Sequence, residues 1–179
     1  AVDQTTSNRR NFKLQELIRE TLNILHPTLK KTPYTVDVDI SPDLEEVEMD
    51  SFPGPLVQVL TNLINNALIH AFDGRENGSI RIEVRDAGSA RLSLTVRDDG
   101  KGIPEKILPK IFDPFFTTRL GEGGSGLGLH IVHNIVVQTL GGSLKAKSRV
   151  GTGTEIVLEL PIVAPVLTSA DGNPWASGN

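Results

Sequence analysis

Two glycine-rich stretches contain the residues whose types and spacing could do chemistry. The first, residues 98–102, follows a strand-like segment, and the second, residues 121–129, opens an apolar helical pattern. Glycine at this density usually means that the backbone adopts positive φ or approaches a ligand closely. Amides exposed ahead of a helix bind anions, most commonly phosphate. Each stretch alone is therefore compatible with a phosphate site or with a flexible surface loop.

A third candidate is a group of asparagines within a helical pattern over residues 53–71. Asn62, Asn66, Ile69 and His70 lie at i, i+4, i+7 and i+8, on a different face from the broad apolar stripe. Asparagine is a poor helix former, so the three at positions 62, 65 and 66 are unusual. This polar face is typical either of a binding site or of a surface exposed to solvent.

These candidates belong to a chain with the composition of a soluble globular domain. Its 179 residues are 38% hydrophobic and 22% charged, with a net charge of −4. This charge gives no basic field for nucleic acid, and the absence of cysteine excludes disulfide and thiolate chemistry. No apolar run approaches the roughly 20 residues of a membrane span, and no signal peptide is visible. Because the sequence starts at Ala1, we expect a fragment of a longer protein.

Hydrophobic periodicity predicts the elements that must position the candidates. Helices are expected over residues 15–31, 53–71 and 127–140, and strands over residues 34–40, 80–85, 92–97, 144–148 and 155–160. Pro27 is expected to kink or shorten the first helix, and an acidic loop is expected up to Asp50. Half-apolar strands favour a mixed, mostly antiparallel sheet with one covered face. We therefore predict an α/β fold, a two-layer sandwich with helices on one side.

Five short motifs, taken in order, carry a resemblance to a known family. The chain resembles the ATP-binding catalytic domain of bacterial sensor histidine kinases, which belong to the GHKL superfamily. The N box, first glycine box, F box, second glycine box and third glycine box match residues 58–67, 98–102, 111–118, 124–129 and 151–154. The resemblance covers residues 12–161 and implies the Bergerat fold. It also implies that residues 1–11 end an upstream dimerisation region and that residues 162–179 form a flexible tail or linker.

The resemblance implies a site for ATP and Mg²⁺. Asp98 would accept the exocyclic amine of adenine, and Thr154 would support the same edge of the base through a water. Asn66 would ligate Mg²⁺, and Asn62 would lie near the phosphates and the metal, so these two are the predicted catalytic residues. The other residues implied to contact the nucleotide are His70, Gly100, Gly102, Ile103, Phe115, Gly124, Ser125, Gly126, Leu127, Gly128 and Leu129.

Two departures from the family pattern concern the phosphates and the acceptor. The family usually has a lysine or arginine three residues after the metal asparagine, where this chain has Ile69. A histidine kinase also needs an acceptor histidine on a helix, typically followed by Glu or Asp, and none of the four histidines has that setting. His130 and His133 are expected to be solvated. We therefore expect the acceptor upstream of Ala1 or on a partner.

Three functions from different classes follow from the resemblance. The first is a kinase domain that passes the γ-phosphoryl group of ATP to a histidine. The second is a hydrolase, which is disfavoured because family ATPases place a glutamate base where this chain has Asn62. The third is a catalytically silent nucleotide-binding module or an anti-sigma-type serine kinase. A P-loop enzyme is excluded because the sequence contains no G-x-x-x-x-G-K-[ST].

The kinase hypothesis also implies partners and a location. The partners would be the protein's own upstream dimerisation and phosphoacceptor domain and a response regulator. The intact protein would be a homodimer, whereas the fragment would be monomeric. The domain would be cytoplasmic, without nucleic acid or direct membrane contact, in an intact protein that is either soluble or anchored in a membrane.

Overall fold

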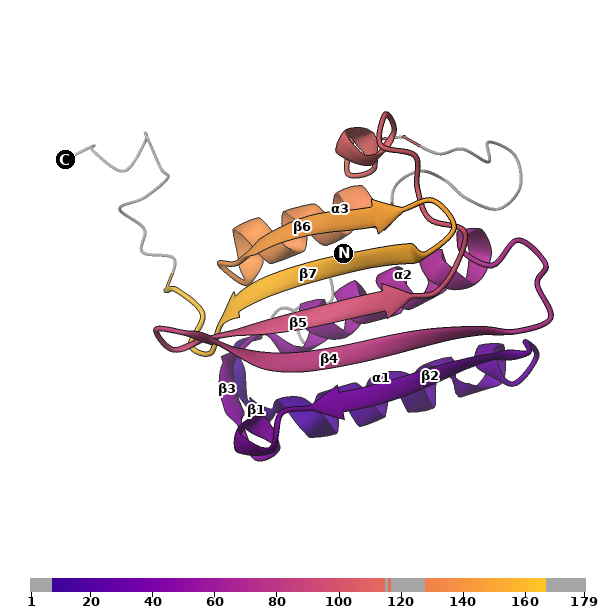
Figure 1. The fold of residues 1–179 in the computed structure, drawn as a ribbon. Coiled ribbons are helices and arrows are strands. Elements are labelled where there is room, and N and C mark those ends of the chain that lie inside the picture. The colour runs from indigo at the N-terminus through magenta and orange to yellow at the C-terminus, as the bar shows by residue number, and fades with distance from the viewer. Residues whose placement is uncertain (1–7, 115, 117–127, 167–179) are drawn as a thin grey trace.

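The computed structural model describes residues 8–114, 116 and 128–166 of the chain, and its elements form two layers (Figure 1). One layer is a five-stranded sheet in the order β2-β4-β5-β7-β6. Its strands are β2 (Tyr34–Ile40), β4 (Gly78–Gly88), β5 (Arg91–Asp98), β6 (Ser143–Arg149) and β7 (Gly153–Pro161). The other layer lies on one face of this sheet (Figure 1) and contains α1 (Leu14–Leu29), α2 (Pro53–His70) and α3 (Gly128–Asn134).

The strand pairing confirms the predicted mixed, mostly antiparallel sheet. β2 runs parallel to β4, and the other three neighbouring pairs are antiparallel. Each observed strand contains the range predicted for it, extended by up to three residues at either end. β4 and β5 form the expected hairpin, with Ser89 and Ala90 both at positive φ in its turn. Two consecutive residues at positive φ are the geometry of a type I′ turn, whose twist matches that of the flanking strands.

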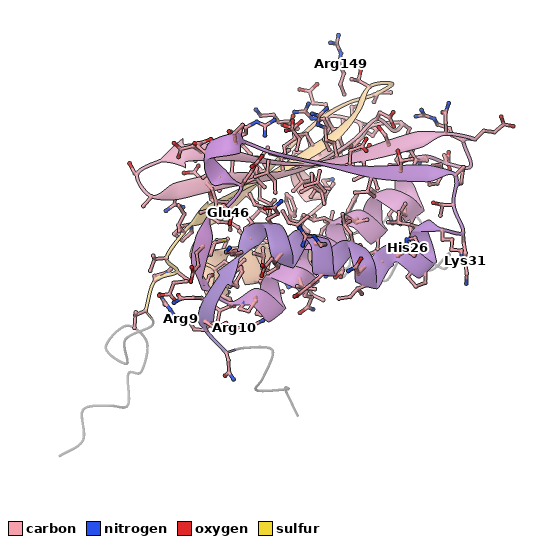
Figure 2. The ribbon with its side chains drawn as sticks, turned by 90° about the horizontal axis from the view of Figure 1, so that it is seen from below. Arg9, Arg10, His26, Lys31, Glu46 and Arg149 are labelled. Carbon is pink, nitrogen blue, oxygen red and sulfur yellow. The ribbon has the colours of Figure 1, made fainter. Side chains whose placement is uncertain are left out.

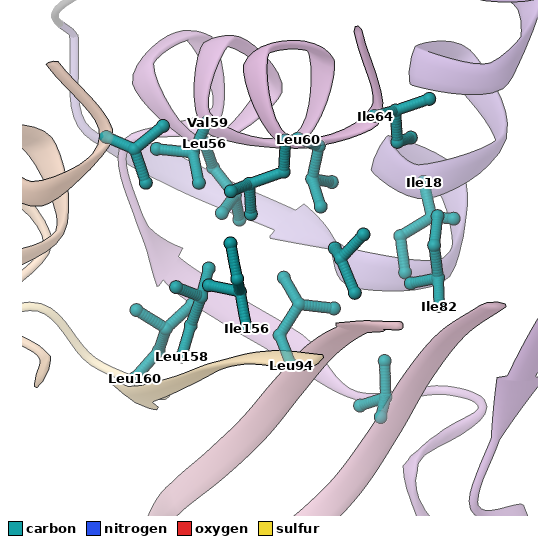
Figure 3. Close-up of a cluster of buried hydrophobic side chains, with 14 of the residues drawn as sticks. Ile18, Leu56, Val59, Leu60, Ile64, Ile82, Leu94, Ile156, Leu158 and Leu160 are labelled. Atoms are coloured by element: carbon teal, nitrogen blue, oxygen red, sulfur yellow. The ribbon is translucent and has the colours of Figure 1, made fainter. Parts of the chain in front are cut away.

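The core lies between the covered face of the sheet and the apolar stripe of α2 (Figure 3). Side chains alternate between the faces of a strand, so every second residue of β4, β5 and β7 points at the helices. Fully buried members include Leu60, Ile64, Ile82, Leu94 and Leu158. Complete burial of each such side chain contributes about 1.5–3 kcal/mol. This packing fixes the position of α2 against the sheet, and with it the polar face formed by Asn62, Asn66 and His70, which we call the asparagine stripe.

Two helices end differently from the prediction. α1 was expected to end at residue 31 and ends at Leu29. It continues through Pro27, so the proline does not stop the helix, and the helix ends two residues earlier than predicted. α3 is followed by a π-helical segment, Ile135–Thr139, where one α-helix was expected. In this segment the Leu140 N–H donates to the Ile135 carbonyl at 2.9 Å, five residues back rather than four.

A small second sheet was not predicted from the sequence. It pairs β1 (Arg10–Lys13) with β3 (Glu48–Ser51), within stretches that were expected to be a polar terminus and an acidic loop. Both strands have only four residues and are largely polar, so they give no periodic signal. The predicted domain limits at residues 12 and 161 remain predictions, but β1 begins before the first of them.

Asp50 of β3 connects the two ends of the described chain. Its Oδ1 accepts a hydrogen bond from Arg9 Nε at 2.8 Å, and its backbone pairs with Ile162 and Ala164 at 2.9 and 2.8 Å. Arg9 also donates to the Pro165 carbonyl at 3.4 Å. Figure 2 shows Arg9 at this corner, beside the last described residues. We call this group, Arg9, Asp50 and residues 162–165, the terminal clamp.

The uncovered face of the sheet is held together by charged pairs. Asp39 accepts hydrogen bonds from Arg81 and Arg85, both at 2.6 Å, and these guanidinium groups hold the pKa of its carboxyl below the ordinary value. Arg97 bridges Glu83 and Glu155 at 3.4 and 3.1 Å. Such a face is compatible with solvent and leaves one apolar face to bury. No helix in the described ranges is long and apolar enough to cross a membrane.

Candidate functional site

Three polar side chains meet at one end of the sheet. Asp98 is the last residue of β5 and lies opposite Thr154 of β7, which in turn lies opposite Ser148 of β6. All three occupy inward-facing positions in strands whose other inward residues are apolar, and all three are half-buried. The antiparallel register, rather than sequence proximity, brings them together.

The two carboxylate oxygens of Asp98 have different surroundings. Oδ1 accepts hydrogen bonds from the Gly100 amide at 2.9 Å and the Thr154 amide at 3.3 Å. Within the described residues both of these hydrogen bonds go to Oδ1. The other oxygen, Oδ2, can therefore accept a hydrogen bond from a ligand. Burial raises the pKa of Asp98, and the two amide hydrogen bonds partly offset this. The side chain is therefore a fixed, half-buried acceptor with one oxygen available.

Ser148 is a functional candidate that the sequence prediction missed. Its Oγ accepts a hydrogen bond from the Ile103 amide at 2.7 Å, donates one to the Gly153 carbonyl at 2.9 Å and lies 2.8 Å from Thr154 Oγ1. It thereby joins the first glycine box to the third. The available signal was a polar residue at an inward position of a strand where Leu144 and Ala146 are apolar.

The first glycine box is braced on two sides. The Lys101 amide donates to the Ala71 carbonyl at 2.8 Å, and the Lys101 carbonyl accepts from the Gly151 amide at 2.9 Å. Gly102 has φ of +77°, and a Cβ there would lie 2.2 Å from the Arg149 carbonyl oxygen. Only glycine fits this position without displacing the β6–β7 turn. These contacts indicate that the first glycine box is an ordered loop rather than a flexible surface loop.

The asparagine stripe runs along α2 toward this loop. Asn62, Asn66 and His70 are all half-buried, whereas Ile69 beside them is 42% exposed. His70 immediately precedes Ala71, whose carbonyl binds the Lys101 amide, so the end of the stripe adjoins the first glycine box. The Gly100 amide binds Asp98, and Ile103 binds Ser148. The structure therefore places the C-terminal end of α2, which follows the N box, against the first glycine box, and this box is hydrogen-bonded to the third.

Further predicted residues lie on and before α3. Gly128 and Leu129 begin this helix, which packs against α2, and both are half-buried. His130 and His133 were predicted to be solvated and are half-buried instead. The His133 ring packs against Phe112 with centroids 6.1 Å apart, and His130 Nε2 lies 3.2 Å from Asn134 Nδ2. Phe115, Gly124, Ser125, Gly126 and Leu127 lie outside the described residues.

A hollow of about 420 Å³ adjoins the polar end of the sheet. Its lining includes Asp98, Ser148 and Thr154 together with the outward-facing residues Arg97, Lys147, Arg149 and Glu155. Another hollow, of about 460 Å³, lies between α1 and β2 and contains none of the predicted site residues. The first hollow therefore lies beside Asp98 and Thr154 at the strand ends, and it does not include Asn62, Asn66 or His70.

The residues present determine how a metal ion would be held. No group of three or more His, Cys, Asp or Glu side chains that could hold a metal occurs within the described ranges. A Mg²⁺ ion here would need most of its oxygen ligands from nucleotide phosphates and water, with one side-chain oxygen from Asn66. Magnesium usually binds in this way, through one or two protein ligands plus substrate phosphates. The site thus fits a metal that arrives with its nucleotide.

The sequence matches one large ATPase family. Residues 53–164 match the family described as histidine kinase-, DNA gyrase B-, and HSP90-like ATPase. The sensor histidine kinase ZraS of Salmonella typhimurium is 38% identical over 151 residues, which cover 84% of this chain and 31% of that protein. The sensor histidine kinase AruS of Pseudomonas aeruginosa is 35% identical over 170 residues, which cover 89% of this chain and 16% of that protein. The chain therefore spans about a third or less of these relatives.

Solved structures give the same assignment. The nucleotide-free catalytic domain of histidine kinase ThkA superposes with a TM-score of 0.74 at 31% identity, covering 87% of this chain and 97% of that domain. ThkA in complex with the response regulator protein TrrA superposes with a TM-score of 0.69 at 29% identity, covering 86% of this chain and 41% of that one. The chain belongs to the family of histidine kinase-, DNA gyrase B- and HSP90-like ATPases and, within it, to the catalytic domains of histidine kinases.

Proposed function

We propose that this chain binds ATP with Mg²⁺ and transfers the γ-phosphoryl group to a histidine outside these residues. The observation that carries the proposal is the half-buried Asp98 carboxylate, whose Oδ1 is held by two backbone amides while Oδ2 is left to a ligand. The 6-amino group of adenine donates to such an acceptor, whereas the 6-carbonyl group of guanine is repelled by it. The site therefore supports adenine as the base.

The phosphates would lie farther along α2 from this end. Asn66 would supply its side-chain oxygen to the metal, and Asn62, one turn earlier, would face the phosphates. The bound metal would offset the negative charge that shifts between the phosphate oxygens during transfer. The described part of the second glycine box, Gly128 and Leu129, would present backbone amides to the same phosphates.

The residues on α2 favour transfer over hydrolysis. A hydrolase must remove a proton from water with a general base. Asn62 occupies the position where the resemblance to family ATPases implies a glutamate, and an amide cannot accept that proton. Ile69, which replaces the usual cation, is the feature that most favours a silent module. The buried network around Asp98 and Ser148 favours a working nucleotide site.

The proposed function includes partners outside this chain. We infer a response regulator as the final acceptor because the related ThkA was solved in complex with the response regulator protein TrrA. A dimerisation domain of the same protein would carry the acceptor histidine and make the intact protein a homodimer. The net charge of −4 gives no support for nucleic acid as a partner. The domain would work in the cytoplasm, without itself contacting a membrane.

Phosphoryl transfer to an added acceptor tests this proposal directly. We expect no label on the chain after incubation with γ-labelled ATP, because none of its histidines is followed by an acidic residue. An added dimerisation domain with a helical His-Glu or His-Asp acceptor should become labelled, and the same domain with that histidine changed to glutamine should not. Efficient self-labelling, or release of phosphate without labelling of the acceptor, would contradict the kinase assignment.

The metal assignment is tested by Asn66→Ala. ADP affinity should fall by about tenfold with Mg²⁺ present and by less than about twofold in EDTA, because only the metal-bound complex uses the amide oxygen. Isothermal titration calorimetry in the two buffers measures both values. Asn65→Ala, next to it on the same helix and also half-buried, is the matched control and should change neither. Equal losses in the two buffers would show that Asn66 is structural.

A further inference from the structure

We infer that Ser148 is a positioning residue that fixes the direction of the hydrogen bonds made by Thr154 and thereby helps to restrict the site to adenine. The inference rests on the proposed function, since it concerns the base-binding end of that site. It starts from the three contacts of one hydroxyl group. Ser148 Oγ lies 2.7 Å from the Ile103 amide, 2.9 Å from the Gly153 carbonyl and 2.8 Å from Thr154 Oγ1.

One assignment of hydrogen atoms satisfies all three contacts. A serine hydroxyl has one proton to donate and two lone pairs that accept. The Ile103 N–H can only donate, so it uses one lone pair, and the Gly153 carbonyl can only accept, so it takes the serine proton. The remaining lone pair of Ser148 then accepts the proton of Thr154. The hydroxyl of Thr154 is therefore committed as a donor toward Ser148.

This commitment determines what Thr154 offers to a ligand. With its proton directed at Ser148, Thr154 Oγ1 presents only lone pairs. Thr154 lies opposite Asp98 in the β5–β7 ladder, and Asp98 Oδ2 is also an acceptor. At the base-binding edge, Asp98 and Thr154 thus offer a ligand two neighbouring acceptors, and neither side chain offers it a donor. It favours a base that donates there, as the 6-amino group of adenine does, and disfavours one with a 6-carbonyl group.

A purely structural role for Ser148 would have a different effect. If Ser148 only braced the first glycine box through Ile103, its loss would loosen the site for every nucleotide. If it fixes Thr154, its loss frees the threonine proton to donate to a 6-carbonyl oxygen. The affinities for adenine and hypoxanthine nucleotides then change by different factors. The ratio of the two affinities distinguishes the roles, whereas either affinity alone does not.

Calorimetry with ADP and inosine diphosphate measures that ratio. We expect the wild-type chain to bind inosine diphosphate at least about tenfold more weakly than ADP. Ser148→Ala should lower this ratio about fivefold, and Ser148→Thr, which keeps the hydroxyl group, should restore most of it. Ser143→Ala, at an exposed position of the same strand, is the matched control and should leave the ratio unchanged. Equal weakening of both nucleotides in Ser148→Ala would overturn the inference.

Variants of Thr154 test the same step without changing the bonds of Ser148 to the backbone. Thr154→Val should lower the ratio, Thr154→Ser should keep it, and adding Ser148→Ala to Thr154→Val should lower it no further. The two single variants of Thr154 test this step even if Ser148→Ala does not fold. An unchanged ratio in Thr154→Val would also overturn the inference.

The same titrations separate this inference from the proposed function. A wild-type chain that binds neither nucleotide contradicts both. A wild-type chain that binds ADP and inosine diphosphate equally contradicts the adenine assignment and the inference with it. A wild-type chain that prefers ADP, with Ser148→Ala keeping that preference, contradicts the role of Ser148 alone.

Discussion

Asp98→Asn is expected to weaken the binding of ADP by about tenfold or more. A hydrogen bond to a charged group contributes about 1.5–3 kcal/mol, and 1.4 kcal/mol corresponds to a tenfold change in affinity. Asparagine keeps the shape of the side chain but removes its charge. If its oxygen keeps the two backbone donors at Gly100 and Thr154, its NH2 group takes the place of Oδ2 and meets the adenine amine as a second donor. Isothermal titration calorimetry suits the measurement because the sole tryptophan, Trp175, is far along the sequence from the site.

Asp99→Asn is the matched control for this change. It removes the same charge one residue away, where Asp99 is exposed and accepts a hydrogen bond from the Ser79 amide at 2.9 Å. We expect it to change ADP affinity by less than about threefold, since an exposed charge is well screened. An unchanged ADP affinity in Asp98→Asn, or wild-type affinity for GTP equal to that for ATP, would remove Asp98 from the adenine site.

The pH dependence of binding gives a second measurement on the same residue. Burial raises the pKa of Asp98, so the carboxyl becomes protonated at a higher pH than an exposed aspartate does. Only the ionised form accepts the adenine amine with full strength. ADP affinity of the wild-type chain should therefore fall as the pH is lowered toward this raised pKa, and the affinity of Asp98→Asn should not show that fall.

Gly153→Ala is expected to damage the site and the fold together. Gly153 has φ of +133°, and a Cβ there would lie 2.0 Å from the carbonyl oxygen of Asp98. Because this oxygen belongs to the backbone, β5 and β7 must separate at the pair that holds Asp98 opposite Thr154. Overpacking costs about 1–3 kcal/mol, and each kcal/mol lowers the melting temperature of a chain of this size by about 2–4 °C. We expect a melting temperature lower by about 2–12 °C and ADP affinity lower by about tenfold or more.

Gly151→Ala separates this contact from backbone strain. Gly151 lies in the same turn at φ of +86°, but a Cβ there meets nothing within 4 Å. Gly151→Ala therefore destabilises the fold only by placing alanine in a left-handed conformation, about 1–2 kcal/mol. We expect it to lower the melting temperature while leaving ADP affinity nearly unchanged. If the two alanine variants lose equal affinity, the close approach of Gly153 to Asp98 has no role in binding.

The sheet and its helical layer could be predicted because burial imposes a period on the sequence. α2 was predicted to within one residue at its C-terminal end, since residues such as Leu56, Leu60 and Ile64 must all face the sheet. The strands alternate for the same reason. Asp98 and Thr154 were identified as partners only through the family resemblance, because their sequence separation of 56 residues carries no local signal.

The features that escaped prediction depend on long-range contacts. β1 and β3 are short and polar, and their pairing is decided by the contacts of Met49 and Asp50 rather than by periodicity. The π-helical segment keeps the apolar pattern of an α-helix, so periodicity does not distinguish the two. Ser148 looked like an ordinary strand serine because its partners Ile103 and Thr154 come from other segments.

The terminal clamp has a geometric consequence for how motion reaches the nucleotide. Ile162 binds the Ala90 carbonyl at the start of β5, whereas Asp98 ends the same strand eight residues later. With a rise of about 3.4 Å per residue, the distance along the strand between the two points is about 27 Å. A tilt of about 10° at the clamp would then move Asp98 through about 5 Å at this strand length. Because both described ends of the chain meet at the clamp, a twist applied to either one would act at this corner of the sheet, one strand length away from the proposed adenine end.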